Sequence, residues 1–229
     1  MDDLNLSQKT SRAQKSIQGG PHFDPHLIEA DGSPAGNIEN TGYLLKRSID
    51  LLVSGMALVI LFPVFLILAL TIKITSPGSI FFRQKRLGVG EKPFMILKFR
   101  SMRTDSESTG PQFTTANDSR ITGIGKFIRK TSLDEIPQLI NIFRGEMSLI
   151  GPRPYVGFEL ADVSVVNRQQ RASIRPGVSG LAQVSGRSRL SQSAVIQFDL
   201  EYVEKCSLML DLRIVLKTVQ KVITCEGTN

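Results

Sequence analysis

An uncharged run of 22 residues, from Leu51 to Ile72, constrains the fold of this chain more than any other feature. Lys46 and Arg47 precede the run, and Lys73 closes it. A helix of about 20 apolar residues crosses the hydrocarbon core of a bilayer, whereas buried helices of soluble proteins seldom run this far without a charge. The run therefore predicts that the chain is bound to a membrane.

Pro63 lies in the middle of this run and predicts a kink, because proline has no amide hydrogen to donate within a helix. Both flanks are basic, with Lys46 and Arg47 before the run and, after it, Lys73, Arg83, Lys85, Arg86, Lys92, Lys98, Arg100 and Arg103. This near-symmetry favours a hairpin with both ends on the cytoplasmic side, so we expect a re-entrant helix-break-helix over residues 43–75. A single crossing is the alternative, since the downstream side is the more basic and spanning helices tolerate proline kinks.

Residues 1–42 are predicted to form a disordered or flexible leader, because they are polar, contain several prolines and show no sustained apolar period. No apolar segment follows Met1, which argues against a secretory signal. Residues 76–229 are expected to form one cytoplasmic domain at the membrane surface, α+β in class and mainly helical. Amphipathic patterns over residues 198–203 and 211–219 predict helices that pack on the core or on the membrane surface.

The chain carries 28 Lys and Arg against 21 Asp and Glu, a formal charge of +7. This excess indicates anionic partners, namely nucleic acid, phosphorylated substrates or an anionic membrane leaflet. A nucleic-acid-binding function explains neither the apolar run nor an acidic pair at the centre of the chain, so we expect no nucleic-acid partner. Cys206 and Cys225 lack metal-ligand spacing, and the only histidines, His22 and His26, lie in the predicted leader. These positions argue against a zinc site or a histidine-based triad.

An acidic pair, Asp134 and Glu135, follows a basic cluster and precedes an apolar helical pattern. One interpretation is structural, because Ser132 and Glu135 fit a capping box. Pro137 then falls past the first turn, so the helix either starts nearer Asp134 or is kinked. The other interpretation is catalytic: one carboxylate attacks phosphorus, a second holds a divalent metal, and arginines neutralise the phosphate. Candidate arginines for this task are Arg129, Arg144, Arg153, Arg171, Arg175, Arg187 and Arg189.

Two short segments, residues 79–88 and 93–103, mix aromatic and basic residues between Gly and Pro. They predict either a pair of half-buried strands or amphipathic pieces that lie in a headgroup layer. These segments belong to a series of blocks that occur in order along the chain: KRSIDL, the apolar run with its central proline, SPGSIFFRQKRLG, FMILKFRSMR, TSLDEIPQLINIFRGEMSLIGPRP and RPGVSGLAQVSGR.

On these blocks, from about Leu44 to Ile223, the chain resembles the bacterial sugar transferases that are monotopic phosphoglycosyl transferases. The resemblance implies transfer of a sugar-1-phosphate from a UDP-sugar to a polyprenyl phosphate, undecaprenyl phosphate, with release of UMP and with Mg²⁺ as cofactor. It places the enzyme in the bacterial inner membrane, with its catalytic domain on the cytoplasmic face. Enzymes of this kind start the assembly of exopolysaccharides, of the O-antigen of lipopolysaccharide, or of glycoprotein glycans.

The resemblance also implies roles for individual residues. Asp134 matches the family's nucleophile and would carry a covalent aspartyl-phosphosugar intermediate. Glu135 matches the partner carboxylate and, with Asp134, would hold the metal. Arg129 matches a phosphate-binding arginine, and Lys98 and Arg100 are further candidates for contacts with phosphate or a headgroup.

Two later blocks provide further candidates. The family assigns the GPRP block to the donor nucleotide, which singles out Arg153 and Pro154. Two prolines fix the backbone around Arg153, and a cis peptide bond is one way in which they do so. The structural alternative is that the block is only a rigid loop that closes the helix after Glu135. Arg175 and Gln183, in the glycine-rich block, are candidate substrate contacts, with a structural turn as the alternative.

One position departs from the family pattern. Many members carry serine directly before the proline that breaks the membrane helix, and this chain has Phe62 there. A serine hydroxyl helps to satisfy backbone groups freed by the break, so its absence weakens the prediction of a re-entrant turn. The rival class is a non-catalytic, membrane-anchored polysaccharide-assembly protein that binds anionic lipid. The sequence does not identify the sugar, because pockets for different sugars differ by only a few contacts. A homo-oligomer is compatible with the sequence.

Overall fold

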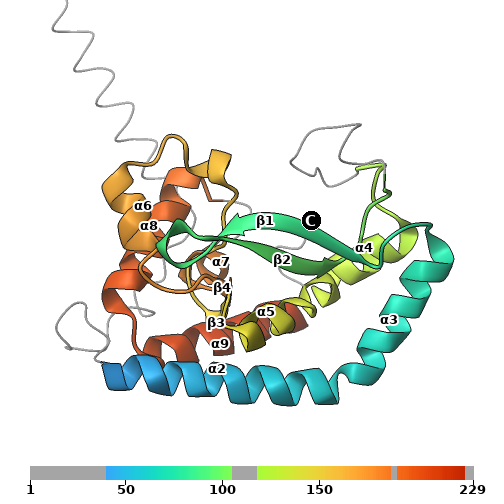
Figure 1. The fold of residues 1–229 in the computed structure, drawn as a ribbon, viewed down its shortest axis with the longest axis horizontal. Helices are drawn as coiled ribbons and strands as arrows, with labels where there is room; N and C mark the ends of the chain where they lie inside the picture. The colour runs from blue at the N-terminus through green and yellow to red at the C-terminus, as the bar shows by residue number, and fades with distance from the viewer. Residues whose placement is uncertain (1–39, 105–117, 187–189, 225–229) are drawn as a thin grey trace, which may run out of the picture.

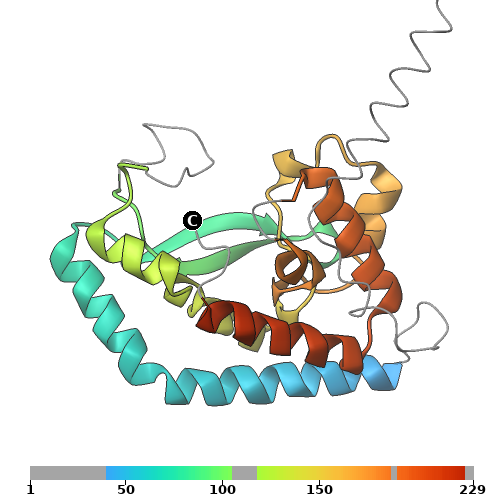
Figure 2. The same cartoon turned by 180° about the vertical axis from the view of Figure 1, so that it is seen from behind.

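The computed structural model describes residues 40–104, 118–186 and 190–224. The predicted leader, up to residue 39, lies outside these residues, as do Arg187 and Arg189. The described part of the chain is mainly helical and has two small sheets (Figures 1 and 2), which confirms the expected α+β class.

The apolar run forms two helices, α2 (Asn40–Ile60) and α3 (Phe62–Thr75), that meet at a bend of 61°. Pro63 lies in the first turn of α3, where a missing amide hydrogen leaves no gap in the ladder. Figure 1 shows α3 turning away from the end of α2 at the edge of the molecule. Within the described residues no single helix has the length and apolar composition of a membrane span, whereas the bent pair together meets both criteria. The predicted kink at Pro63 is confirmed.

The remaining described elements follow in chain order. A hairpin of β1 (Phe81–Leu87) and β2 (Pro93–Phe99) encloses the 3₁₀ turn η2 (Val89–Glu91). Next come α4 (Gly123–Lys130), η3 (Leu133–Glu135), α5 (Gln138–Arg144), β3 (Ser148–Ile150), η4 (Gly157–Leu160), α6 (Val165–Arg171) and β4 (Gly177–Ser179). The chain then forms α7 (Leu181–Ser185), α8 (Gln192–Lys205) and α9 (Leu208–Ile223). The helices α8 and α9 cover the two predicted amphipathic patterns.

The hairpin is antiparallel and spans the molecule. Its register pairs Phe81 with Phe99 at one end and Leu87 with Pro93 at the other. The first end lies beside α3 and α4, and the second lies beside α6 and α8 (Figures 1 and 2). The strand interpretation of the two segments is therefore confirmed, although the second strand ends at Phe99 and not at residue 103.

A second, two-stranded sheet pairs β3 with β4 in parallel. Gly177, the first residue of β4, lies very close to Gly151, which directly follows β3: a Cβ at Gly177 would lie only 2.1 Å from the backbone nitrogen of Gly151. Only glycine at position 177 permits this approach. The glycine-rich block therefore has a structural role in this sheet.

The inward face of α3 packs on the hairpin and on α4. Leu68 and Ile72 are buried in one cluster with Phe99 and Ile128. The ring of Phe65 lies 4.8 Å, centroid to centroid, from that of Phe99. This packing joins the second half of the apolar run to the end of β2.

The helix α2 is held to the domain by polar contacts in addition to apolar packing. Lys46 Nζ donates to the Ile150 carbonyl at 3.0 Å and pairs with Asp211 at 2.5 Å. The backbone amide of Leu149 donates to Asp50 Oδ1 at 2.9 Å. The charged residues before the apolar run therefore anchor α2 to β3 and α9.

Candidate functional site

The acidic pair lies in a turn between two helices. The helix α4 ends at Lys130, and Ser132 turns the chain with a left-handed backbone, at φ 57°. Asp134 and Glu135 follow on η3, and Pro137 precedes α5 as its N-cap residue. The Ser132 side chain makes no capping hydrogen bond, so the capping-box interpretation is wrong. Because Pro137 lies before the helical ladder, its missing amide hydrogen leaves α5 intact.

Four of the predicted residues come together around this turn. Lys98 Nζ, from β2, pairs with Glu135 Oε1 at 2.7 Å. The charges of Lys98 and Arg129 both act on Asp134. The structure thus brings two carboxylates and two cations together from β2, α4 and η3, which is the charge pattern expected around a phosphate.

Burial raises the pKa of Asp134 to about 6, and Glu135 adds a smaller rise. Lys98 and Arg129 act in the opposite direction, since a nearby positive charge favours the ionised carboxylate. Burial also lowers the pKa of Arg129, which the charge of Asp134 partly offsets. A carboxylate with a raised pKa is more nucleophilic than an ordinary one, yet it is still ionised at neutral pH.

Asp134 and Glu135 are the candidate ligands of a magnesium ion that a substrate phosphate would also bind. Among the described residues no group of three or more His, Cys, Asp or Glu side chains is placed to hold a metal ion. Mg²⁺ is commonly held by one or two carboxylates together with substrate phosphates. Asp134 and Glu135 match that mode, in which the substrate completes the site.

Arg100 makes its described hydrogen bonds at the end of α3 and not with the acidic pair. It is buried, with 7% of its surface exposed, and it donates from Nη1 to the Pro77 carbonyl and from Nη2 to the Ser76 carbonyl, both at 2.7 Å. These carbonyls directly follow α3. In the structure, Arg100 therefore ties the end of the bent helix pair to the end of β2.

Arg153 and Pro154 lie toward the opposite end of the hairpin. The Pro154 carbonyl accepts a hydrogen bond from Arg86 Nη1 at 2.9 Å. Arg86 pairs with Phe94, whereas Lys98 lies four residues further along β2, which is roughly 13 Å along the strand. Arg153 is exposed, and no peptide bond among the described residues is cis. The loop therefore holds its shape with trans prolines.

Arg175 and Gln183 have their described contacts elsewhere. Arg175 Nε donates to the Gly145 carbonyl at 2.8 Å, and its guanidinium lies over the Tyr43 ring and donates to the Tyr43 hydroxyl. Arg47 reaches the same end of α5, donating to the Ile142 carbonyl at 2.7 Å. The buried Oε1 atom of Gln183, on α7, has no hydrogen-bond partner.

Three further residues support the site and its loops: Asn141 and Asp199, to which the sequence analysis gave no role, and Arg171, which it named only among the candidate arginines. Asn141, fully buried on α5, accepts from the Leu97 amide and donates to the Met95 carbonyl, at 3.0 and 2.8 Å. This side chain fixes α5 against the free edge of β2, so it fixes the turn just before α5 as well. Arg171 and Asp199 form the second support. No spacing or composition signal marks these supporting contacts, because each joins residues that are distant in sequence.

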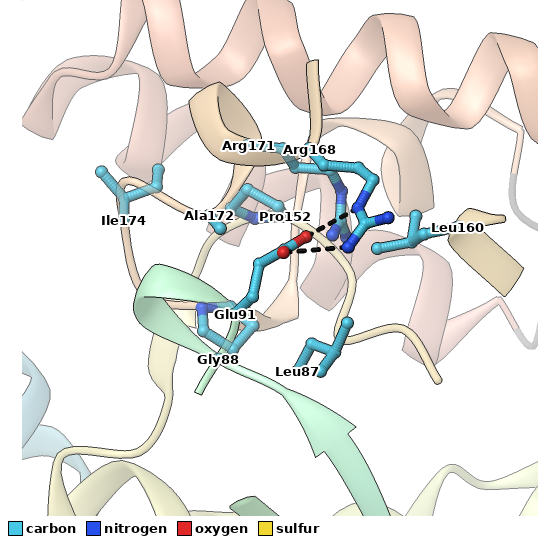
Figure 3. A pocket seen from close by; sticks show the side chains of 10 residues that line it. Leu87, Gly88, Glu91, Pro152, Leu160, Arg168, Arg171, Ala172 and Ile174 are labelled. Carbon is cyan, nitrogen blue, oxygen red and sulfur yellow. Dashed lines mark hydrogen bonds and ion pairs between the residues drawn. The ribbon is translucent and has the colours of Figure 1, made fainter. Parts of the chain in front are cut away.

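The buried pair Arg171–Asp199 supports the loop that carries Arg153. Arg171 Nε lies 2.7 Å from Asp199 Oδ2, and the two side chains are 6% and 1% exposed. The Arg171 guanidinium stacks over the Tyr155 ring at 4.4 Å and also donates to the Arg153 carbonyl. Figure 3 shows Arg171 lining a pocket beside the ion pair of Glu91 and Arg168. That pocket, of about 10 Å³, is large enough for one water and too small for a sugar or a nucleotide.

The sequence matches the family model described as bacterial sugar transferase over residues 41–225. It is 39% identical over 198 residues to a UDP-glucose:undecaprenyl-phosphate glucose-1-phosphate transferase of Xanthomonas campestris pv. campestris, covering 82% of this chain and 41% of that protein. It is 39% identical over 208 residues to the exopolysaccharide production protein ExoY of Sinorhizobium fredii, covering 84% of this chain and 92% of that one.

A third relative carries a different sugar in its name. The UDP-N-acetylgalactosamine-undecaprenyl-phosphate N-acetylgalactosaminephosphotransferase of Aeromonas hydrophila is 40% identical over 192 residues, covering 80% of this chain and 44% of that protein. The chain thus spans less than half the length of two of these relatives and nearly all of the third.

Proposed function

Because this chain belongs to the bacterial sugar transferase family, we propose that it transfers a sugar-1-phosphate from a UDP-sugar to a polyprenyl phosphate, undecaprenyl phosphate, and releases UMP. The reaction would be the first membrane step in the synthesis of an exopolysaccharide, an O-antigen or a glycoprotein glycan. The observation that carries this proposal is the meeting of Asp134 and Glu135 with Lys98 and Arg129 in one turn.

The proposed transfer takes two displacements at phosphorus. In the first, a carboxylate oxygen of Asp134 attacks the β-phosphorus of the UDP-sugar, the bond from this phosphorus to the bridging oxygen breaks, and UMP leaves with that oxygen. In the second, a phosphate oxygen of the polyprenyl phosphate attacks the same phosphorus, and the Asp134 carboxylate leaves. The product is a polyprenyl diphosphate sugar, and the enzyme is regenerated.

The neighbours of Asp134 have separate tasks in this scheme. Arg129 binds phosphate oxygens through its guanidinium, whose fork matches them in two places. Lys98 orients Glu135 through their ion pair. Glu135 and Asp134 would hold Mg²⁺, which when bound neutralises diphosphate charge and improves UMP as a leaving group. Arg153, Pro154, Arg175 and Gln183 remain candidates for donor contacts, whereas Arg100, buried and bonded to the Ser76 and Pro77 carbonyls, is assigned a structural role and no headgroup contact.

We place the chain at the cytoplasmic face of the bacterial inner membrane, with α2 and α3 as a re-entrant pair. Large apolar side chains are exposed along both helices: Leu44, Leu52, Met56, Val59, Ile60, Phe62, Leu66, Ile67, Leu70 and Ile74. The helix α9 runs beside α2 (Figure 2) and exposes a further stripe: Met209, Leu212, Leu216, Val219 and Ile223. Exposed apolar surface of this extent supports contact with a lipid bilayer.

A labelling experiment separates re-entry from crossing. Ser48, in α2 before the apolar run, and Ser79, after the end of α3, flank the apolar run and are exposed. Each is replaced by cysteine in a chain whose Cys206 and Cys225 are alanine. In a re-entrant pair both ends lie on one side, and a membrane-impermeant maleimide is expected to label Ser48→Cys and Ser79→Cys in inside-out vesicles but not in intact spheroplasts. Labelling of the two positions from opposite sides would show that the pair crosses the bilayer.

The function is tested by UMP release from purified protein with Mg²⁺ and undecaprenyl phosphate, across a panel of UDP-sugars. Release from one donor, dependent on the lipid for multiple turnovers, is the expected result and also identifies the sugar. Absence of UMP with every donor, from folded and membrane-bound protein, would favour a non-catalytic assembly protein.

The first displacement is expected to depend on pH in a defined direction. Since burial raises the pKa of Asp134 to about 6, the nucleophile becomes protonated as the pH falls through that value. The single-turnover rate of UMP release should then fall about tenfold per pH unit below about pH 6 and level off above about pH 7. Leaving out the polyprenyl phosphate removes the titration of the acceptor from the profile. A midpoint near pH 4 would contradict a buried, weakly acidic nucleophile.

A further inference from the structure

Ser101 holds Arg129 through a hydrogen bond that sequence reasoning did not anticipate. The serine follows the end of β2 and is buried, with 7% of its surface exposed. Arg129 Nε donates to Ser101 Oγ at 2.7 Å. Within the described residues this is the only hydrogen bond that the Arg129 side chain makes to a protein group, and it uses one of the five N–H donors of a guanidinium.

The backbone of the same serine seats the helix that carries Arg129. The Ser101 carbonyl accepts from the Thr122 amide at 3.0 Å and from the Thr122 hydroxyl at 3.3 Å. The Thr122 hydroxyl in turn accepts from the Gly125 amide and caps α4. A Cβ at Gly125 would lie 1.9 Å from the Ser101 carbonyl oxygen, so this contact requires glycine.

These contacts place Arg129 directly over Ser101. Arg129 lies four residues after Gly125, on the same face of α4. The first turn of α4 is therefore docked on the backbone of Ser101, and the next turn is docked on its hydroxyl. The hydroxyl fixes the Nε edge of the guanidinium, which limits the directions that the Nη groups can take.

We propose that Ser101 is a positioning residue for sugar-phosphate transfer: its Oγ orients the guanidinium of Arg129 so that the Nη groups meet the phosphate brought to Asp134. This inference rests on the proposed function, since it requires a phosphate as the ligand of Arg129. Ser101 itself touches no substrate in this scheme and acts through Arg129.

Removal of the hydroxyl tests this role against a matched control. Ser101→Ala is compared with Ser179→Ala, because Ser179 is buried to a similar extent, 8% exposed, and its hydroxyl contacts Thr218 on α9. We expect kcat/KM for the UDP-sugar to fall about tenfold or more in Ser101→Ala, the scale of a lost hydrogen bond to a charged group. In Ser179→Ala it should stay within about twofold of wild type.

A double-mutant cycle separates positioning from a general structural effect. When Arg129 is already alanine, Ser101 has no guanidinium to orient, so adding Ser101→Ala is expected to lower the residual rate by less than about twofold. A similar factor in both backgrounds would overturn the inference, as would a wild-type rate in Ser101→Ala. If Ser101→Ala does not fold, Ser101→Cys takes its place in the cycle, because a thiol occupies the same space but is a weak acceptor.

The wild-type rate distinguishes failure of this inference from failure of the proposed function. If wild type and Ser179→Ala release UMP while Ser101→Ala matches them, only the role of Ser101 is rejected. If wild type releases no UMP from any donor, the proposed function is rejected, and the role of Ser101 with it.

Discussion

Asp134→Asn is expected to abolish UMP release, with a fall of more than about a thousandfold. Asparagine keeps the size of the side chain but provides no carboxylate oxygen to form the bond to phosphorus. The measurement is UMP release beside an acid-quenched trap of protein labelled from a radioactive UDP-sugar, in which the covalent adduct of wild type should be missing from the variant. Asp162→Asn serves as the control, because Asp162 is an exposed acid outside the turn that carries the pair.

The loss in Asp134→Asn should not come from unfolding. Burial raises the pKa of Asp134 to about 6 in the folded protein, above the value of about 3.9 in an unfolded chain. The folded state therefore binds the proton more tightly, and the ionised carboxylate destabilises the fold above about pH 6. Asparagine avoids this, so the melting temperature at pH 7.5 is expected to equal or exceed that of wild type. Retained UMP release in a folded variant would reject Asp134 as the nucleophile.

Asp199→Ala is expected to lower the free energy of unfolding by about 3 to 5 kcal/mol. The change removes the carboxylate that pairs with Arg171 and leaves a buried guanidinium without its counter-charge. It also removes the acceptor of the Arg153 amide, so the loop that carries Arg153 loses its support. Chemical denaturation followed by circular dichroism measures the change.

A neighbouring ion pair on the same helix provides the comparison for Asp199→Ala. Glu201 pairs with Lys205 at 3.0 Å on α8, with side chains 27% and 47% exposed. Glu201→Ala should change the free energy of unfolding by less than about 0.5 kcal/mol, because solvent screens an exposed pair. The double change Arg171→Met with Asp199→Leu should recover part of the loss, since it leaves no charge buried. Equal losses at Asp199 and Glu201 would show that burial does not govern the strength of these pairs.

The sequence was sufficient for the features that depend on neighbours along the chain. The length of the apolar run and the position of Pro63 predicted two helices and a break, because proline acts on its own turn whatever surrounds it. Glycine and proline around residues 79–103 bounded two strands, since these residues restrict the local backbone. The acidic pair was recognised as a unit because the two residues are adjacent. Local pattern was not sufficient at Ser132. The four residues Ser132 to Glu135 fit a capping box, but this prediction was wrong because Ser132 has a left-handed backbone and makes no capping hydrogen bond.

The tertiary structure alone decided which distant residues meet. Lys98 reaches Glu135 across 37 positions, Arg129 reaches Ser101 across 28, and Arg171 reaches Asp199 across 28. No periodicity links such residues, because their contacts follow from how α4 and α5 pack against β2 and how α8 packs against α6. The same packing turns Arg100 toward the end of α3 and Arg175 toward α5, although their sequence context resembles that of a phosphate-binding arginine. Residue type thus determined what chemistry this chain can support, and packing determined which side chains are close enough to perform it.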